Sequence, residues 1–385
     1  MRFSVCAIAV PSLKAMVNYL VFLAISTATY ALFGLGLNLQ WGYTGLINFG
    51  HVAFMTVGAY TTVLLSSQGV PLLIAVIIGS TIAALLGLLI GFSTLRLRED
   101  YLAIVTIGVA ELIRLVALNE EWLTKGAFGV QGYPLPLGDF NPNLVGKLVM
   151  IAVLTLITGF ALWQLWLWVW SKPQANKADE KVSSKPAISR LVLGIINLLL
   201  CVAFYIAGVA GLYDYTYKAG LMLLSLVVLA LVYWGLERLV RSPWGRVLKA
   251  IREDEQIPRA LGKNVFWYKL QALMLGGAIG GLAGSFYAWQ LTTVYPTNFE
   301  PIITFNAWTI VVLGGGGNNL GTLLGAVIFW AYDAGTRFIL PSIVQLDDAR
   351  LGAFRIMVIG LILMVVMIWR PQGILGKKEE LTLGK

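Results

Sequence analysis

The sequence predicts an all-α, polytopic membrane protein, and its composition and its apolar runs carry this prediction. Hydrophobic residues form 58% of the 385 residues and charged residues only 12%, whereas soluble domains average roughly 45–50% and about 25%. One water-soluble core cannot bury this surplus, and the mean hydropathy of +0.80 agrees. Soluble enzymes, nucleic-acid-binding proteins and disordered proteins are therefore disfavoured, despite the net charge of +9.

Apolar runs long enough to cross a bilayer core, about 20 residues each, follow one another along the chain and predict about ten or eleven membrane-spanning helices. The runs cover residues 16–37, 45–66, 70–92, 101–118, 144–170, 191–212, 218–240, 268–288, 302–316, 320–340 and 351–369. Glycines interrupt the runs at 45–66 and 302–316, so we expect these two to be broken or re-entrant.

We expect a single transmembrane domain over residues 16–376, with an N-terminal extension before it and a cytoplasmic tail at 377–385. The extension, residues 1–15, carries only a short apolar run, and we interpret it as not cleaved. Two hydrophilic stretches interrupt the domain. Residues 171–190 are typical of a flexible polar linker, and residues 241–264 lie in the longest hydrophilic loop between spans.

The distribution of Lys and Arg predicts the orientation of the chain. These residues concentrate in the segments 93–100, 171–190 and 241–267 and in the C-terminal tail, which we therefore place in the cytoplasm. The loops at 119–143 and 341–350 contain more acidic than basic residues and are expected on the other side. With eleven spans, the N-terminus lies outside.

The segment at 42–54 is unusual for a lipid-facing helix, because glycines alternate in it with Thr44, Asn48 and His51. Small residues let helices approach closely, and polar side chains hydrogen-bond across helices. Two interpretations follow. The segment is a tightly packed helix whose His51 is satisfied by a neighbouring carbonyl, or it lines a path across the membrane.

A second glycine-rich stretch begins at Gly314 and Gly315. It is not a Walker-type phosphate loop, because no Gly-Lys-Ser or Gly-Lys-Thr follows it. Glycine here favours a tight turn between two membrane segments. Both glycines are also pathway candidates, since Gly-interrupted segments point to the binding site in many transporters.

Two pairs of opposite charges lie within apolar runs, where charges are costly and face the bundle interior. Glu111 and Arg114 are three residues apart on one predicted helix and can pair. This pair is either a structural ion pair or part of a pathway or gate. Asp333 and Arg337, four residues apart, allow the same two interpretations.

The cysteine and histidine content excludes several kinds of chemistry. Cys6 and Cys201 lie in separate apolar runs, and His51 is the only histidine. A disulfide framework, a Cys-based metal site and a multi-histidine metal or haem site are therefore excluded. We predict no catalytic residue and no metal ligand.

The loop at 241–264 predicts a short amphipathic helix at the cytoplasmic surface. Ser242 followed by Pro243 favours a helix start, and Leu248 and Ile251 belong to one apolar face.

Further along this loop, we expect Pro258 to break the helix and a second short turn to end at Gly262. The loop is either a solvated basic segment held by lipid headgroups or a docking helix for a cytoplasmic partner.

Several stretches of the chain are shared, in the same order, with one family of transport proteins. They are GYTGLINFGHVAF at 42–54 with Gly58-Ala59-Tyr60; Tyr101–Thr106 running to Glu111–Leu115; Ser-Pro-x-Gly-Arg, Ile-Arg-Glu-Asp-Glu and Ala-Leu-Gly-Lys-Asn within 241–264; Lys269 to Gly284–Ala288; Val312–Gly315 to Gly325-Ala326; and Arg370–Gly376. Through them the chain resembles the LivM-type permease subunit of branched-chain and neutral amino acid ABC importers over most of residues 30–376.

The resemblance implies a non-enzymatic pore subunit of an ABC importer permease bundle. Such a subunit pairs with a sister permease, receives substrate from a periplasmic binding protein, and is driven by two cytoplasmic ATPases. ATP and Mg belong to the ATPases, so this chain is expected to bind no cofactor.

The loop at 241–264 is similar to the family's coupling helix, which contacts the ATPase. The implied coupling residues are Gly245, Arg246, Ala250, Arg252, Glu253, Glu255, Ala260, Leu261 and Gly262. Two small residues usually precede the glycine of the coupling motif, whereas this chain has Ile257 and Pro258.

Neutral or branched-chain amino acids are the expected substrates. The bacterial inner membrane is the expected location, and membrane lipid is an expected partner. A related branch that imports urea and short amides shares these stretches and is the alternative. An ion-coupled secondary transporter, a different class, should instead show a carboxylate or histidine relay and would need no coupling helix. No nucleic-acid partner is expected.

Overall fold

The computed structural model describes residues 13–96, 99–138, 140–170, 188–343, 347–369 and 372–376, and almost all of them are helical. The longer helices are α1 (Leu13–Leu37), α2 (Val52–Ser67), α3 (Leu72–Thr94), α4 (Glu99–Asn119), α6 (Leu144–Trp170), α7 (Ile188–Tyr213), α8 (Tyr217–Arg241), α9 (Pro243–Glu253), α11 (Val265–Leu291), α12 (Ile302–Gly314), α13 (Asn319–Ile343) and α14 (Asp348–Trp369). The shorter elements are η1 (Asn38–Gly42), α5 (Glu121–Thr124), η2 (Gly126–Phe128), α10 (Gln256–Ala260) and η3 (Pro296–Phe299). Two-residue strands β1 (Val130–Gln131) and β2 (Thr293–Val294) pair antiparallel. The predicted all-α class is confirmed.

Every predicted apolar run contains a helix, but the helices differ in length. Among the described residues, six helices are long and apolar enough to cross a membrane, or seven if a bent pair is counted as one span. This count covers the described residues only, so the ten or eleven spans stay a prediction for the whole chain. The 16-residue α2 is apolar but shorter than a full span.

The two glycine-interrupted runs are broken, as predicted. Residues 43–51 are not regular helix, and α2 begins only at Val52. At the other break, Pro296–Gly314 and Asn319–Arg337 meet at an angle of 118°. A bent pair of this kind is a broken span or a re-entrant loop. Non-helical backbone at membrane depth requires cover from protein or from a water-filled cavity.

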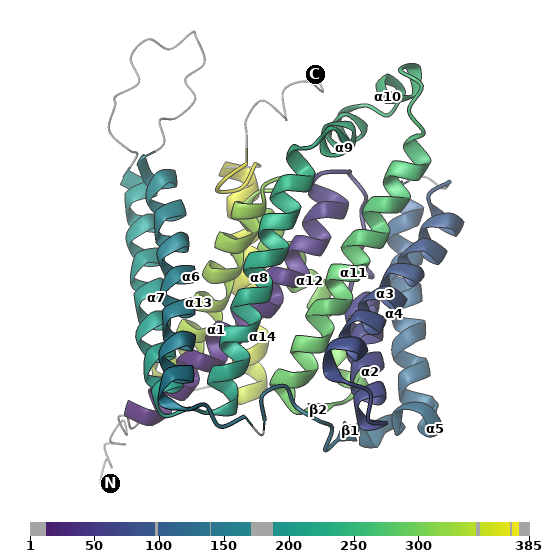
Figure 1. The fold of residues 1–385 in the computed structure, drawn as a ribbon. Coiled ribbons are helices and arrows are strands. Elements are labelled where there is room, and N and C mark those ends of the chain that lie inside the picture. The colour runs from purple at the N-terminus through teal and green to yellow at the C-terminus, as the bar shows by residue number, and fades with distance from the viewer. Residues whose placement is uncertain are drawn as a thin grey trace, which may run out of the picture. The chain divides into compact units, whose positions relative to one another are not determined.

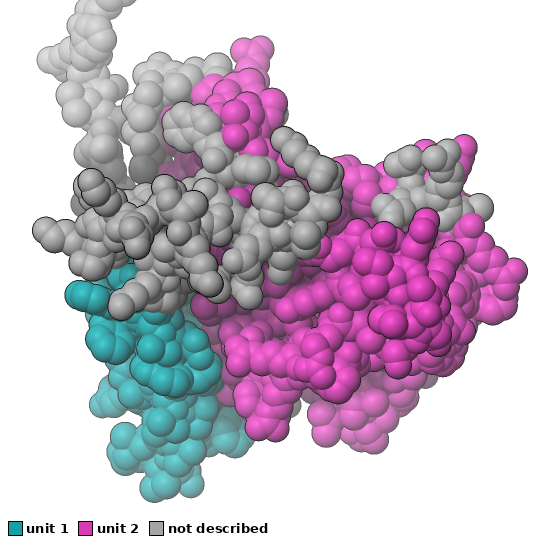
Figure 2. Space-filling view, turned by 90° about the horizontal axis from the view of Figure 1, so that it is seen from above, with its two compact units in different colours: residues 1–25, 139–224 teal, residues 26–138, 225–385 magenta. Residues whose placement is uncertain are grey.

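The chain divides into two compact units, which Figure 2 shows in different colours. Unit 1 comprises residues 1–25 and 139–224, and unit 2 comprises residues 26–138 and 225–385. The predicted extension up to residue 12, most of the 171–190 linker and the tail at 377–385 lie outside the described residues.

Unit 1 contains the antiparallel pair of α6 and α7. The two helices approach closely at Gly208, where an added Cβ would lie 2.7 Å from Leu154 Cδ2. The Thr155 and Tyr205 hydroxyls also share a hydrogen bond of 3.1 Å. Large apolar side chains such as Leu156 and Trp166 are exposed, as expected for helices in contact with lipid.

Unit 2 contains the main core, in which α2, α3 and α11 pack against one another. Glycines replace side chains at these contacts. A Cβ on Gly58 would lie 2.1 Å from the Gly281 carbonyl oxygen, and one on Gly284 would lie 2.1 Å from the Met55 carbonyl oxygen. The predicted close approach of the segment that follows residue 42 is therefore confirmed.

The two ends of unit 2 differ. The α9–α10 loop lies at one end, together with the last turns of α3 and α8, and the β1–β2 pair and α5 lie at the other (Figure 1). The buried Tyr133 hydroxyl fastens the β1 end by donating to the Ala288 carbonyl oxygen at 2.5 Å. Burial also raises the pKa of Tyr133.

Candidate functional site

The helix predicted in the loop at 241–264 is present as α9. It begins at Pro243, which occupies the first helical position after the N-cap residue Ser242. Proline is favoured there because the N–H that it lacks would have no partner within the helix. Leu248 and Ile251 are buried, so the predicted apolar face is confirmed. This face seats α9 against the body of unit 2, where Leu248 joins a core cluster with Leu39 and other residues.

The predicted break at Pro258 is wrong in position. Helix α9 ends at Glu253 because Asp254 is extended, with φ −158° and ψ 117°. Pro258 instead lies within the first turn of α10, where backbone N–H groups have no intrahelical partner and proline costs little.

The end of α10 at Gly262 is confirmed. Gly262 has φ +73°, and the Lys263 N–H donates to the Pro258 carbonyl oxygen at 2.9 Å. The Gly262 N–H donates to the Arg259 carbonyl oxygen at 3.0 Å, which completes a Schellman cap.

Three side-chain contacts fasten the loop to unit 2. Arg252 Nη1 donates to the Gly42 carbonyl oxygen at 2.6 Å. Trp244 Nε1 donates to Gln271 Oε1 at 2.7 Å. Glu255 pairs with Lys269 on α11 and with Arg259, the latter at 3.1 Å.

The nine predicted coupling residues fall into three groups by exposure. Gly245 is buried and has no room for a side chain, since a Cβ would lie 2.1 Å from the Val240 carbonyl oxygen. Ala250, Arg252 and Glu255 are half-buried. The exposed members are Arg246, Glu253, Ala260, Leu261 and Gly262.

The tip of the loop is apolar and exposed. Leu261 is 74% exposed and Ile257 is 56% exposed. Ile257 is a candidate contact that the sequence analysis treated only as a departure from the family pattern. The sequence could have indicated this contact, because Ile257 and Leu261 are two large apolar residues about one helical turn apart in a hydrophilic loop.

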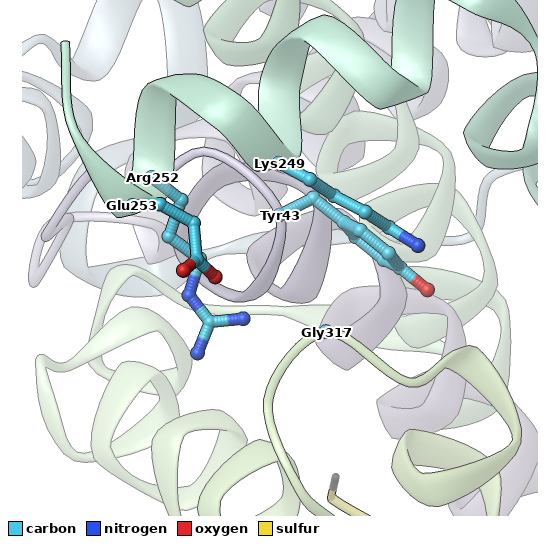
Figure 3. Close-up of a pocket in the computed structure, with 5 residues that line it drawn as sticks. All are labelled: Tyr43, Lys249, Arg252, Glu253 and Gly317. Atoms are coloured by element: carbon cyan, nitrogen blue, oxygen red, sulfur yellow. The ribbon is translucent and has the colours of Figure 1, made fainter. Parts of the chain in front are cut away.

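A small hollow, open to solvent, lies where α9 meets the end of η1. It is lined by Tyr43, Lys249, Arg252, Glu253 and Gly317. The Lys249 side chain runs alongside the Tyr43 ring (Figure 3), with Nζ 5.6 Å from the ring centroid. Arg252 thus contacts the last residue of η1, and Lys249 contacts the first residue after it.

The predicted pathway residues near His51 are buried. Thr44 Oγ1 donates to the Leu39 carbonyl oxygen at 3.0 Å, and Asn48 Nδ2 donates to Gln40 Oε1 at 2.9 Å. The Asn48 carbonyl oxygen accepts from Trp308 Nε1 at 3.1 Å. These contacts tie the irregular segment before α2 to η1 and α12.

The His51 ring is completely buried against Phe33 and Phe54, with ring centroids 4.6 and 5.4 Å away. Among the described residues, neither ring nitrogen makes a hydrogen bond of normal geometry, and the Phe33 backbone is the polar group that interacts with the ring. These contacts show the tight packing that the first of the two interpretations predicts.

The predicted charge pairs are both formed. Arg114 donates to the two carboxylate oxygens of Glu111 at 2.9 and 2.5 Å, which is a bidentate geometry. Arg337 Nε donates to Asp333 Oδ2 at 2.7 Å. The first pair lies on α4, about one and a half turns beyond Thr106, whose hydroxyl accepts from the Phe49 N–H at 3.2 Å.

Gly314 and Gly315 form the tight turn that the sequence predicts. A Cβ on Gly314 would lie 2.0 Å from the Gly321 carbonyl oxygen, and Gly315 has φ +107°. A segment from the far end of the chain also covers this turn. The N–H groups of Ile374 and Leu375 donate to the carbonyl oxygens of Leu313 and Gly314 at 3.0 and 2.9 Å.

Sequence reasoning missed the polar side chains that connect these parts. Asn38 and Gln40 on η1, Asn319 at the start of α13 and Glu237 on α8 are hydrogen-bonded to one another or to neighbouring segments. The available signal is the position of two amides at the end of an apolar run. Their partners are not visible in the sequence, because Asn38 and Asn319 are 281 positions apart.

No group of three or more His, Cys, Asp or Glu within the described ranges could hold a metal ion. What the structure provides instead is a set of broken apolar helices, buried polar side chains at the breaks and an exposed two-helix loop. These features define a multi-pass membrane permease.

The chain matches the family described as branched-chain amino acid transport system / permease component over residues 19–367. It therefore belongs to this family, and it is a transport permease component rather than an enzyme.

Relatives agree with this assignment. The chain is 31% identical over 354 residues to the high-affinity branched-chain amino acid transport system permease protein LivM of Salmonella typhimurium, which covers 92% of this chain and 69% of the relative. The LivM protein of Escherichia coli gives the same values. A permease protein named LivM from Methanocaldococcus jannaschii is 26% identical over 371 residues, covering 92% of each chain. No solved structure matches the chain.

Proposed function

We propose that this chain is the membrane-spanning subunit of an ABC importer that carries neutral, branched-chain amino acids across a bacterial inner membrane. The family match over residues 19–367 is the observation that carries this proposal. The names of the most similar relatives favour branched-chain amino acids over urea.

The proposal includes partners that supply the rest of the transporter. Two cytoplasmic ATPases bind ATP and Mg and engage the α9–α10 loop, a sister permease completes the pore, and a periplasmic binding protein delivers substrate. The exposed Ile257 and Leu261 support the first of these contacts, because neighbouring large apolar side chains exposed to solvent mark interaction sites.

Uptake of labelled leucine, alanine and urea tests the proposal, measured in cells with and without this gene and before and after ATP depletion. We expect loss of ATP-dependent leucine uptake in cells without the gene. Loss of urea uptake alone would move the chain to the urea branch. Leucine uptake that resists ATP depletion but depends on an ion gradient would favour a secondary transporter.

A further inference from the structure

A chain of hydrogen bonds connects three elements at the α9 end of unit 2. The Gly317 N–H donates to Asn38 Oδ1 at 2.9 Å, and Asn38 Nδ2 donates to Asn319 Oδ1 at 3.1 Å. Asn319 Nδ2 then donates to Glu237 Oε2 at 3.1 Å. We call Asn38, Asn319 and Glu237 the polar relay.

The direction of these bonds is determined by the groups at the two ends. A backbone N–H can only donate, so Asn38 must turn its oxygen toward Gly317 and its amide nitrogen toward Asn319. Asn319 must then offer its oxygen to Asn38 and its nitrogen to Glu237. An ionised carboxylate can only accept, so the orientation is consistent along the whole relay.

The relay connects η1, the start of α13 and the end of α8. Asn38 begins η1, Asn319 begins α13 immediately after the 118° break, and Glu237 lies on the last turns of α8, which lead into α9. Glu237 also accepts from Arg241 at 2.8 Å, one turn further toward α9.

Packing around the relay leaves no room for the segments to slip. A Cβ on Gly42 would lie 2.0 Å from Asn38 Oδ1 and 2.4 Å from the Gly317 nitrogen. Arg252 on α9 donates to the Gly42 carbonyl oxygen, so α9 is also bonded directly to the end of η1. The amides of Asn38 and Asn319 are 0% and 1% exposed, and buried polar groups without partners are strongly disfavoured.

We propose that the polar relay is a positioning device for transport: it makes the break between α12 and α13 follow the displacement of α8 and α9. This inference rests on the proposed function in one respect: the partner ATPases supply the force that displaces α9. The relay stays intact during this displacement, so that α8 and the start of α13 move together.

Three variants test the relay through the donor and acceptor roles of its members. In Asn319→Asp a carboxylate faces the Glu237 carboxylate and the donor between them is lost. In Glu237→Gln the amide oxygen still accepts from Asn319. In the double variant, the amide introduced at position 237 donates to the carboxylate introduced at position 319, so the bond is restored with its direction reversed.

Transport is measured in proteoliposomes that contain the co-encoded ATPases and sister permease, with the binding protein added. We expect Asn319→Asp to increase the ATP hydrolysed per leucine transported by about tenfold or more, whereas Glu237→Gln and the double variant stay within about twofold of the wild type. Asn119→Asp is the matched control, because Asn119 is exposed at the end of α4 and its amide donates to the Leu115 carbonyl oxygen rather than to the relay. Equal loss of uptake and hydrolysis in Asn319→Asp, or failure of the double variant to recover, would overturn the proposal.

Hydrogen exchange on the wild type and variants gives a second readout that requires no transport. In Asn319→Asp we expect faster amide exchange at residues 315–319 and in α9 together, and recovery of both in the double variant. Faster exchange at the turn alone would refute the relay. Absence of ATP-dependent leucine uptake in the wild type would refute the proposed function, while the exchange measurement would still decide on the relay.

Discussion

Single glycines decide how closely the helices of unit 2 approach one another. Gly284 on α11 lies against the Met55 carbonyl on α2, and Gly58 on α2 lies against Gly281 on α11. Each position exchanges a side chain for direct backbone contact, which membrane helices use where apolar surface alone gives no driving force for association. The glycine content of these runs indicates close packing, but only the structure identifies which helices are in contact.

Replacing Gly284 by alanine should therefore destabilise unit 2. The new Cβ would lie 2.1 Å from the Met55 carbonyl oxygen, so α2 and α11 must separate. Overpacking of this kind costs about 1–3 kcal/mol, and we expect a lower melting temperature in detergent. Gly108→Ala on α4 is the control, because nothing lies within 4 Å of its added Cβ. Equal melting temperatures for the two variants would contradict the assigned contact.

At the scale of elements, the sequence predicts the start of α9 and the end of α10, because short-range rules determine both. The Ser242-Pro243 start of α9, its apolar face and the glycine at the end of α10 all follow from short-range rules. The break between the two helices does not, because proline is compatible with both a helix end and a first helical turn. Asp254 ends α9 by its extended backbone, and its Oδ1 accepts from the Gln256 N–H at 2.8 Å, a capping role that Asp favours.

The exposed tip of the α9–α10 loop gives a prediction at this scale. Leu261→Asp should lower ATP-dependent uptake about tenfold or more, because full burial of a Leu side chain contributes about 1.5–3 kcal/mol. Ala260→Trp should lower uptake by obstructing the contact. Gln256→Glu, which adds a charge at an exposed polar position of the same helix, should leave uptake within about twofold.

The loop measurement requires equal amounts of each variant in the membrane, determined by immunoblotting. Gly245→Trp is unsuitable for this test. Gly245 has no room for a side chain, so the tryptophan would displace α9 from unit 2. Normal uptake in both Leu261→Asp and Ala260→Trp would remove the tip of the loop from the proposed ATPase contact.

At the scale of the whole molecule, composition is sufficient to predict an all-α membrane protein, but not its arrangement. Apolar runs that face lipid and apolar runs that are buried have similar sequences, so the division into two units is not visible in the hydropathy. The polar relay is equally hidden, because its three members come from distant parts of the chain. The broken runs were predictable, since glycine marks each of them.

The positive-inside rule gives a prediction for the orientation of unit 2. Lys263 and Gln131 are exposed at opposite ends, the first just after α10 and the second on β1. In a variant without Cys6 and Cys201, an impermeant thiol reagent should label Gln131→Cys in intact cells. It should label Lys263→Cys only after permeabilisation. The reverse pattern would invert the proposed cytoplasmic side.

The contact between Gln372–Gly376 and the turn at Gly314 has a consequence for biogenesis. The ribosome makes α12 and α13 before it makes the residues that cover their turn. The Leu313 and Gly314 carbonyl groups therefore lack these hydrogen-bond donors when they are first synthesised. The partners arrive only after α14 has been translated and inserted. Closure of the turn thus depends on the insertion of α14 in the correct register, and a nascent chain arrested within α14 would present an open turn to quality-control proteases.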